Sequence, residues 1–194
     1  MLSHLNHYNI ILASQSPRRL ELLSGLNIPF KVQVIDIDET YPCELVGVDI
    51  PMYLAEKKAN AYLGTMDENT LLITADTIVW HEGQVFNKPI DKNDATAMLK
   101  SLSGKTHQVI TGVCISTINK RKTFHVISEV RFATLSSKEI EYYLQNYKPY
   151  DKAGAYGVQE WIGYIGVEHI DGSYFNVMGL PIQRLYTELK RWKV

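Results

Sequence analysis

The sequence lacks the features that mark several large classes of protein. It has only two cysteines, Cys43 and Cys114, in 194 residues, and their wide separation fits neither a disulfide scaffold nor a zinc site. No apolar run approaches the roughly 20 residues that cross a bilayer. Residues 1–9 are too polar for a signal peptide and carry no lysine or arginine. We therefore expect a soluble, cytoplasmic protein whose free thiols are buried or half-buried in a reducing compartment.

An excess of charge of either sign is also missing. Twenty Lys and Arg face 21 Asp and Glu, which gives a net charge of −1. This balance, without basic stripes in the sequence, argues against a nucleic-acid or membrane partner, so any positive site must be local. The apolar fraction of 45% is ordinary for a globular chain, and the length allows one domain or a two-lobed unit.

The most informative stretch lies near the N-terminus. Residues 10–12 are apolar and predict a strand, after which Ser16 is placed to cap a helix that has Pro17 at its first position. Free amides of the first helical turn and the neighbouring Arg18 and Arg19 would form an anion site suited to phosphate. An ordinary helix start with two solvated arginines would show the same local pattern.

Strands and helices alternate along the chain, with one antiparallel pair in the middle. This order predicts a mixed α/β fold, with a long twisted sheet flanked by helices and no firm domain boundary. Strands are expected at residues 30–37, 71–80, 107–117, 122–135 and 162–170, and helices at 17–24, 52–63, 91–102, 136–146 and 180–192. Ser136 and Glu139 form a capping box at the start of one of these helices.

Asp76 is the most informative single carboxylate. It follows five apolar or small residues within a strand-like run, where burial of a charge is costly without a partner. Asp76 should therefore pair with a cation, bind a metal or act as a base. A purely structural salt bridge is the alternative.

An acidic cluster made of Asp36, Asp38 and Glu39 lies at or just after the end of the expected strand at 30–37. It could share a divalent ion with Asp76, since Mg²⁺ is commonly held by one or two carboxylates together with substrate phosphates. A solvated acidic turn is the simpler interpretation of the local pattern.

Lys58 and Lys88 could neutralise phosphate charge as compact ammonium groups. Lys57 and Lys58 lie in the expected helix 52–63, and because adjacent helical residues point about 100° apart, at most one of them should face a given site. Lys88 follows the strand that carries Asp76. Solvated surface lysines would show the same pattern.

A segment of small residues spans positions 150–159. Its glycines permit close backbone approach and positive φ, so it is a candidate ligand loop or a tight packing corner.

Five short motifs follow one another along the chain: Ala-Ser-Gln-Ser-Pro-Arg-Arg (13–19), Ala-Asp-Thr (75–77), Lys-Pro (88–89), Ser-Gly-Lys-Thr-His (103–107) and Asp-Lys-Ala-Gly-Ala-Tyr-Gly (151–157). Together they resemble those of the Maf family of nucleoside triphosphate pyrophosphatases, also called septum formation inhibitor proteins. The resemblance covers nearly the whole chain, and although each motif alone is unspecific, five in series are specific. One residue departs from the family pattern: Gln15 stands where a small residue is usual.

The resemblance implies a reaction and a fold. The family hydrolyses a nucleoside triphosphate to the monophosphate and pyrophosphate with Mg²⁺ or Mn²⁺, in a house-cleaning role. Asp76 resembles the family's catalytic base and would share the metal with Glu39. Lys58 and Lys88 match the family's basic partners. The implied architecture is two-lobed and similar to that of the ITPases, with a central cleft, formed by residues 1–194 as a single domain. A homodimer is implied by the resemblance only.

The resemblance also implies a substrate branch. Ser14, Ser16 and Arg18 match the family's substrate-binding motif. Arg19, Thr77 and Gln159 resemble the selectivity residues of the branch that acts on dTTP and UTP rather than on 7-methyl-GTP. A non-enzymatic regulator of septum formation, acting through a protein partner, is the rival hypothesis, because the family's older name refers to cell division.

Overall fold

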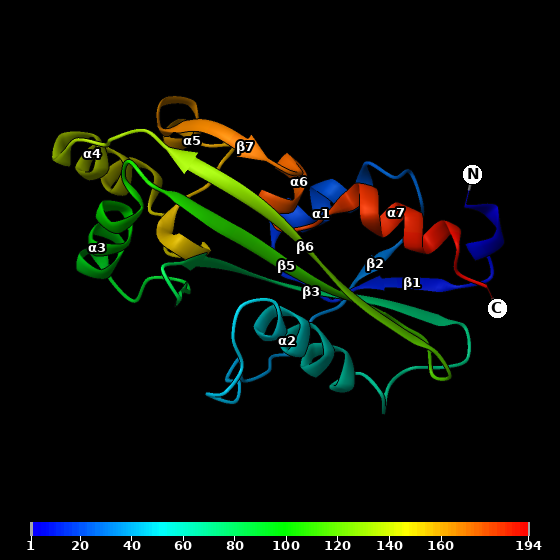
Figure 1. Ribbon diagram of the computed structural model, residues 1–194. Coiled ribbons are helices and arrows are strands. Elements are labelled where there is room, and N and C mark those ends of the chain that lie inside the picture. Colours follow the sequence, from blue (N-terminus) through cyan, green and yellow to red (C-terminus); the bar gives the residue numbers. More distant parts are fainter. Residues whose placement is uncertain (1, 194) are drawn as a thin grey trace. The chain divides into compact units, whose positions relative to one another are not determined.

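The computed structural model describes residues 2–193 and contains one seven-stranded mixed sheet (Figure 1). The strand order is β2-β1-β3-β5-β6-β7, and β4 pairs with β3. The chain divides into two compact units. Unit 1 holds residues 2–76, 111–126 and 179–193, and unit 2 holds residues 77–110 and 127–178. No helix in the described part of the chain has the length and apolar character that crossing a membrane requires.

Unit 1 is built on parallel strands. β1 (Asn9–Leu12) pairs with β2 (Lys31–Val32) on one side and with the start of β3 (Thr70–His81) on the other. Helix α2 (Asp49–Asn60) packs on one face of these strands, and α1 (Pro17–Ser24) and α7 (Ile182–Lys190) lie on the other (Figure 1). The short helix η1 spans Ser3–Leu5.

A close approach fixes helix α2 on the sheet. A Cβ at Gly112, in β5 (Thr106–Ser116), would lie 2.3 Å from the carbonyl oxygen of Pro51, so only glycine fits there. Thr74 adds a hydrogen bond from its hydroxyl to the carbonyl of Ala55 at 2.6 Å. The position of α2, and of the lysines in its last turn, is therefore set from the sheet.

Unit 2 packs its helices around a second core. α3 (Lys92–Leu102) contacts α4 (Ser137–Tyr147), and Leu99, Ile140 and Tyr143 are buried. The capping box predicted at Ser136 is present. The remaining elements with residues in this unit are β4 (Gln84–Phe86), β6 (Arg121–Phe132), which begins in unit 1, η2 (Ala153–Ala155), α5 (Trp161–Gly166), β7 (Val167–Asp171) and α6 (Tyr174–Val177).

The strand predicted over residues 30–37 is wrong in length, because only Lys31–Val32 pairs with β1. The hydroxyl of Tyr62 donates to the carbonyl of Gln33 at 2.7 Å and accepts from the backbone N–H of Ile35 at 2.9 Å. A side chain from beyond α2 therefore takes the backbone groups that a longer strand would have paired.

The strand predicted over residues 162–170 is also wrong in its first half, which forms helix α5. Ile162 and Gly166 are buried four residues apart, whereas Tyr164 between them is 80% exposed. That burial follows a helical rather than an alternating period. Only β7 forms the strand.

The two cysteines differ in environment. Cys114 is buried, as expected, but Cys43 is exposed in the loop before α2, so the expected burial was wrong for Cys43. Burial raises the pKa of the Cys114 thiol.

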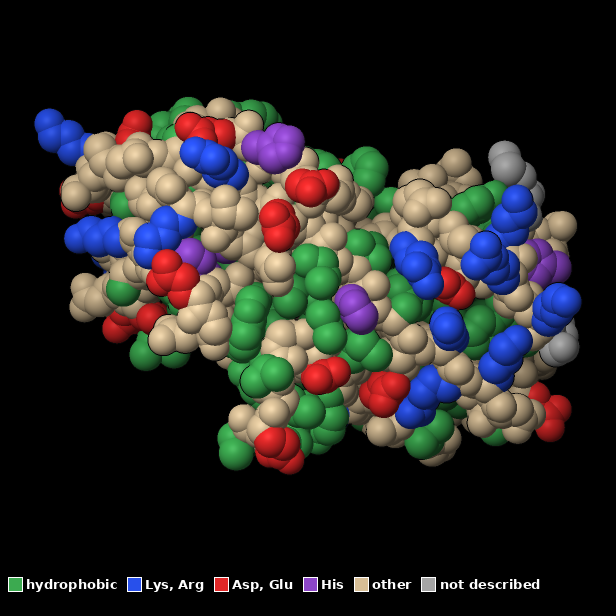
Figure 2. All heavy atoms as spheres, in the orientation of Figure 1, with side chains coloured by type: hydrophobic (Ala, Val, Ile, Leu, Met, Phe, Trp, Pro, Cys, Tyr) green, Lys and Arg blue, Asp and Glu red, His purple; other side chains and the backbone are tan. Residues whose placement is uncertain are grey.

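Positive charge is concentrated on part of unit 1 despite the net charge of −1. Lysine and arginine gather near α7 and the turn between β5 and β6 (Figure 2). The ammonium group of Lys120 donates to the carbonyl of Lys193 at 2.7 Å and lies over the ring of Trp192, which joins the turn to the C-terminal segment. The turn and the C-terminal part of the chain contain Lys120, Arg121, Lys122, Lys190, Arg191 and Lys193.

Candidate active site

The N-terminus of helix α1 has the predicted cap. The hydroxyl of Ser16 accepts from the backbone N–H of Arg19 at 3.5 Å, and Pro17 occupies the first helical turn. The backbone N–H of Ser16 in turn donates to the hydroxyl of Ser14 at 3.2 Å. The two serines therefore shape the turn that opens the helix, where positive dipole and free amides favour an anion.

Arg19 is anchored by protein oxygens. Its Nη1 donates to the carbonyl of Ala75, and its Nε donates to the carbonyl of Gly179, both at 2.8 Å. Nη1 also lies 3.5 Å from the hydroxyl of Ser14. Burial lowers the pKa of the guanidinium, while the charge of Asp76 opposes that shift. Arg19 thus fixes the backbone immediately before Asp76.

Lys58 joins the two carboxylates that the sequence singled out. Its Nζ lies 2.6 Å from Oδ1 of Asp76 and 2.8 Å from Oε1 of Glu39. The side chains of Lys58 and Asp76 are 14% and 12% exposed, so this pair is largely shielded from water. Asp76 lies in β3 beyond the last residue paired with β1, at the carboxyl edge of the parallel strands. Asp76, Glu39 and Lys58 therefore lie together at this edge of the sheet.

Lys57 points elsewhere, as the helical geometry predicts. Its ammonium group donates to the carbonyl of Thr40 at 2.7 Å and lies 3.8 Å from Asp38. Asp38 itself accepts from the hydroxyl and from the backbone N–H of Thr40, and these bonds lower the pKa of its carboxyl. Asp38 therefore belongs to a solvated turn rather than to the carboxylate pair.

The donor set around Lys58 fits a hard divalent cation. Two carboxylates, from Glu39 and Asp76, already converge on one positive charge. Within residues 2–193 no three His, Cys, Asp or Glu side chains group as metal ligands, so the protein would supply two ligands and the substrate or water the rest. This is the arrangement that Mg²⁺ typically takes in phosphate-binding sites.

Arg18 lies in helix α1 of unit 1, and the other three predicted residues lie in unit 2. Thr77 follows Asp76 in β3, Lys88 follows β4 in an exposed loop, and Gln159 lies before α5. The backbone N–H of Gly154 donates to the carbonyl of Asn87 at 3.2 Å, so the loop of Lys88 is tied to the small-residue segment. Gly154 takes the positive φ of 68° that the sequence predicted for this segment.

Gln159 has an unusual carboxamide. Its Oε1 is buried and meets no hydrogen-bond donor in residues 2–193. A buried acceptor without a donor is costly, so this group requires an explanation such as a functional role.

Sequence reasoning missed three residues that surround Gln159. Glu160 receives a hydrogen bond from the hydroxyl of Tyr143 and an ion pair from Lys152 at 3.0 Å. Lys152 is buried at 9% side-chain exposure. The sequence signal that could have revealed this network was a lysine within the run of small residues, next to Asp151 and eight positions before Glu160.

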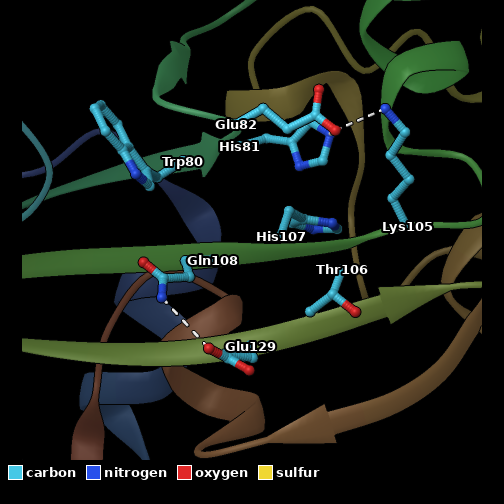
Figure 3. Close-up of a pocket in the computed structure, with 8 residues that line it drawn as sticks. All are labelled: Trp80, His81, Glu82, Lys105, Thr106, His107, Gln108 and Glu129. Atoms are coloured by element: carbon cyan, nitrogen blue, oxygen red, sulfur yellow. Dashed lines mark hydrogen bonds and ion pairs between the residues drawn. The ribbon is translucent and has the colours of Figure 1, made fainter.

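A separate hollow of about 520 Å³ lies in unit 2 (Figure 3). Lys105 and Glu82 form an ion pair at 2.9 Å on its wall, and the amide of Gln108 donates to Glu129 at 3.4 Å. It contains none of the predicted site residues. The residues that line it are Trp80, His81, Glu82, Lys105, Thr106, His107, Gln108 and Glu129.

Comparison with known protein families identifies the family of this chain. Residues 9–192 match the model of the family described as Maf-like protein. The chain belongs to the Maf family.

Relatives of this Maf-family chain share a common description. A protein of Phocaeicola vulgatus is 60% identical over 192 residues, which cover 98% of this chain and 100% of the relative, and is described as a dTTP/UTP pyrophosphatase. The same description applies to a Parabacteroides distasonis protein, 60% identical over 99% of this chain and 100% of the relative. A Flavobacterium johnsoniae protein so described is 49% identical over 95% of each chain.

The solved structure of the Staphylococcus aureus Ham1 protein shares the fold of this Maf-family chain. It aligns with a TM-score of 0.54 at 15% identity, covering 95% of this chain and 100% of the other. The mixed α/β fold expected from the resemblance is therefore confirmed. Gln15, the one departure from the family motif, is exposed, and the contacts of Ser14 and Ser16 remain intact beside it.

Proposed function

We propose that this Maf-family protein hydrolyses dTTP and UTP to the nucleoside monophosphate and pyrophosphate, with Mg²⁺ or Mn²⁺ as the cofactor. The observation that carries this proposal is the convergence of Glu39, Lys58 and Asp76 beside a capped helix N-terminus. The relatives described as dTTP/UTP pyrophosphatases, identical at about half or more of their residues over almost the full chain, support the same substrate pair.

The phosphates would bind where the chain offers donors and positive charge. The amides of the first turn of α1, the hydroxyls of Ser14 and Ser16, and Arg18 are the groups that would hold the triphosphate. Lys58 and Lys88 would offset the charge that moves onto pyrophosphate as it leaves.

Asp76 is the proposed base. Glu39 and Asp76 would hold the divalent cation, which when bound supplies charge neutralisation and a coordinated water of lowered pKa. The Asp76 carboxylate accepts the proton of the water that attacks the α-phosphorus. Lys58, which donates to Oδ1 of Asp76, orients that carboxylate for the task.

Selectivity for the pyrimidine would come from Arg19, Thr77 and Gln159. Uracil and thymine carry a donor at N3, which matches the unpartnered carboxamide oxygen of Gln159. Cytosine carries an acceptor at N3 and would meet this oxygen with a lone pair. Thr77 would shape the pocket, and Arg19, fixed by two carbonyls, would orient the base edge.

The decisive experiment is a nucleotide panel with the purified protein. Pyrophosphate release from dTTP, UTP, CTP, ITP and 7-methyl-GTP is measured with Mg²⁺, with Mn²⁺ and with a chelator. We expect dTTP and UTP to be preferred and the chelator to stop turnover. Preference for ITP or 7-methyl-GTP would overturn the pyrimidine assignment.

A cellular experiment separates this proposal from the regulatory hypothesis. Overexpressed Asp76→Asn should give no division phenotype if hydrolysis is the function. A phenotype that persists in this variant would favour a regulator that acts through a protein partner. Light scattering of the purified protein tests the expected homodimer.

A further inference from the structure

Gln159 lies in the middle of a tight turn. The backbone N–H of Glu160 donates to the carbonyl of Gly157 at 3.0 Å, which closes a four-residue turn with Val158 and Gln159 as its central residues. A Cβ at Gly163 would lie 1.9 Å from the carbonyl oxygen of Val158, so the following helix α5 packs directly against this turn. The backbone that carries Gln159 is therefore closely confined.

One hydroxyl group joins the two ends of the turn. Tyr143, in helix α4, accepts a hydrogen bond from the backbone N–H of Gly157 at 3.0 Å and donates one to the carboxylate of Glu160. The tyrosine is fully buried, so water does not compete for either bond. A Cβ at Gly157 would lie 2.8 Å from Cδ of Glu160, which shows how tightly the carboxylate folds back over the turn.

The second oxygen of Glu160 is held as well. Oε1 lies 3.0 Å from Nζ of Lys152, which also lies 2.7 Å from Asp151. Burial and the charge of Glu160 both raise the pKa of the Tyr143 hydroxyl, so it stays protonated and remains the donor to Glu160. Both oxygens of Glu160 thus have fixed partners, and the turn has one geometry.

We propose that Tyr143 is a positioning residue for nucleobase selection, because its hydroxyl fixes the turn that presents the carboxamide of Gln159 to the N3–H edge of uracil or thymine. This inference rests on the function proposed above. Tyr143 acts only through Gln159 and touches neither the phosphates nor the metal. It should therefore affect the choice between UTP and CTP rather than the hydrolysis step.

The test compares Tyr143→Phe with Tyr147→Phe. Both tyrosines lie in α4 and their rings stack at 5.2 Å, but Tyr147 is 38% exposed whereas Tyr143 is fully buried. Tyr143→Phe should lower the UTP-to-CTP ratio of kcat/KM by about three- to tenfold, mainly through a higher KM for UTP, as expected for the loss of a hydrogen bond. Tyr147→Phe should leave the ratio unchanged. An unchanged ratio in Tyr143→Phe overturns the inference.

A double-mutant cycle with Gln159→Ala separates positioning from a general structural role. If Tyr143 acts through Gln159, Tyr143→Phe has no further effect on the UTP-to-CTP ratio in the Gln159→Ala background. A further fall of similar size in that background contradicts the inference. If Gln159→Ala alone leaves the ratio unchanged, the base-reading role proposed for Gln159 is wrong and this inference is wrong with it.

Glu160→Gln tests the same hydrogen bond if Tyr143→Phe does not fold. Glutamine keeps an oxygen acceptor for the tyrosine hydroxyl but removes the charge that strengthens the bond. The UTP-to-CTP ratio should fall in the same direction by a smaller factor, and no change would contradict the inference. Thermal unfolding curves of each variant establish that the compared proteins are folded.

Discussion

Nζ of Lys58 lies 2.6 Å from Oδ1 of Asp76, although the two residues come from a helix and a strand 18 positions apart. The contact depends on the packing of α2 against the sheet, where Thr74 and Gly112 meet the first turns of the helix. Lys58 also holds Glu39 from the loop before α2. The ammonium group of Lys58 therefore brings together a carboxylate from a strand and one from a loop.

Asp76→Asn should abolish turnover while the protein stays folded. The amide is of similar size but cannot take a proton from water, so we expect kcat to fall by about 10² to 10⁴. Asp38→Asn is the matched control, because Asp38 is exposed and bonds to Thr40. Activity is measured as pyrophosphate release, and normal release by Asp76→Asn would exclude Asp76 as the base.

Lys58→Met should lower both activity and stability. Removal of the ammonium leaves the largely buried carboxylate of Asp76 beside that of Glu39, which is 45% exposed, and we expect a loss of about 2 kcal/mol in the free energy of unfolding. Mg²⁺ should raise the Tm of this variant more than that of the native protein, because the cation can replace the lost charge.

Lys57→Met provides the control for this experiment. Lys57 contacts Thr40 and Asp38 rather than Asp76, so its loss should change stability by less than about 1 kcal/mol. Equal effects of Mg²⁺ on the Tm of Lys58→Met and Lys57→Met would argue against a metal between Glu39 and Asp76.

His107 makes stability depend on pH. Burial lowers its pKa from 6.5 to about 3, so the folded protein keeps the ring neutral, with its Nε2 2.7 Å from the hydroxyl of Tyr156. Below pH 6.5 the unfolded chain binds a proton that the folded protein does not, so stability falls as pH falls towards 3. At pH 5.5 this costs about 1.4 kcal/mol relative to pH 7.5.

His107→Gln should remove that part of the pH dependence. Urea unfolding at pH 7.5 and 5.5 measures the free energy of unfolding of both proteins. The free energy of unfolding of the variant, relative to that of the native protein, should be higher at pH 5.5 than at pH 7.5. A difference independent of pH would show that His107 is protonated equally in both states.

Gly112→Ala should be strongly destabilising. The new methyl group would lie 2.3 Å from the carbonyl oxygen of Pro51, so α2 must move away from β5. We expect a loss of about 2 to 3 kcal/mol, measured by chemical unfolding, and lower activity because Lys58 moves with the helix. Gly64→Ala has open space around the added methyl group and should change stability by less than about 0.5 kcal/mol. Similar losses in both variants would contradict the packing argument.

The sequence predicted those parts of the molecule that local chemistry decides. Ser16 and Ser136 cap helices because a hydroxyl in that position satisfies free amides whatever the tertiary context. From its apolar neighbours alone, Asp76 could be expected to pair with a cation, bind a metal or act as a base, since burial of an unpaired carboxylate is costly. The choice of Lys58 over Lys57 required the helix to be placed against the sheet.

What the sequence could not predict depends on contacts between distant residues. Tyr62 ends the strand at residue 32 by bonding to the backbone of Gln33 and Ile35. The sequence near residue 33 does not indicate this contact. The turn around Gln159 is likewise fixed by Tyr143, sixteen residues earlier in the chain. Such side-chain bonds to the backbone leave no periodic signal.

Arg19 binds the carbonyl of Gly179 with one nitrogen and that of Ala75 with another. The first helix, the strand of the proposed base and the segment that leads into α7 thus meet at a single guanidinium. A deletion that begins at residue 179 would consequently remove one of the two carbonyls that hold Arg19 and so disturb the backbone before Asp76. None of the removed side chains is assigned a chemical role. C-terminal shortening offers a way to weaken catalysis without altering a single proposed catalytic group.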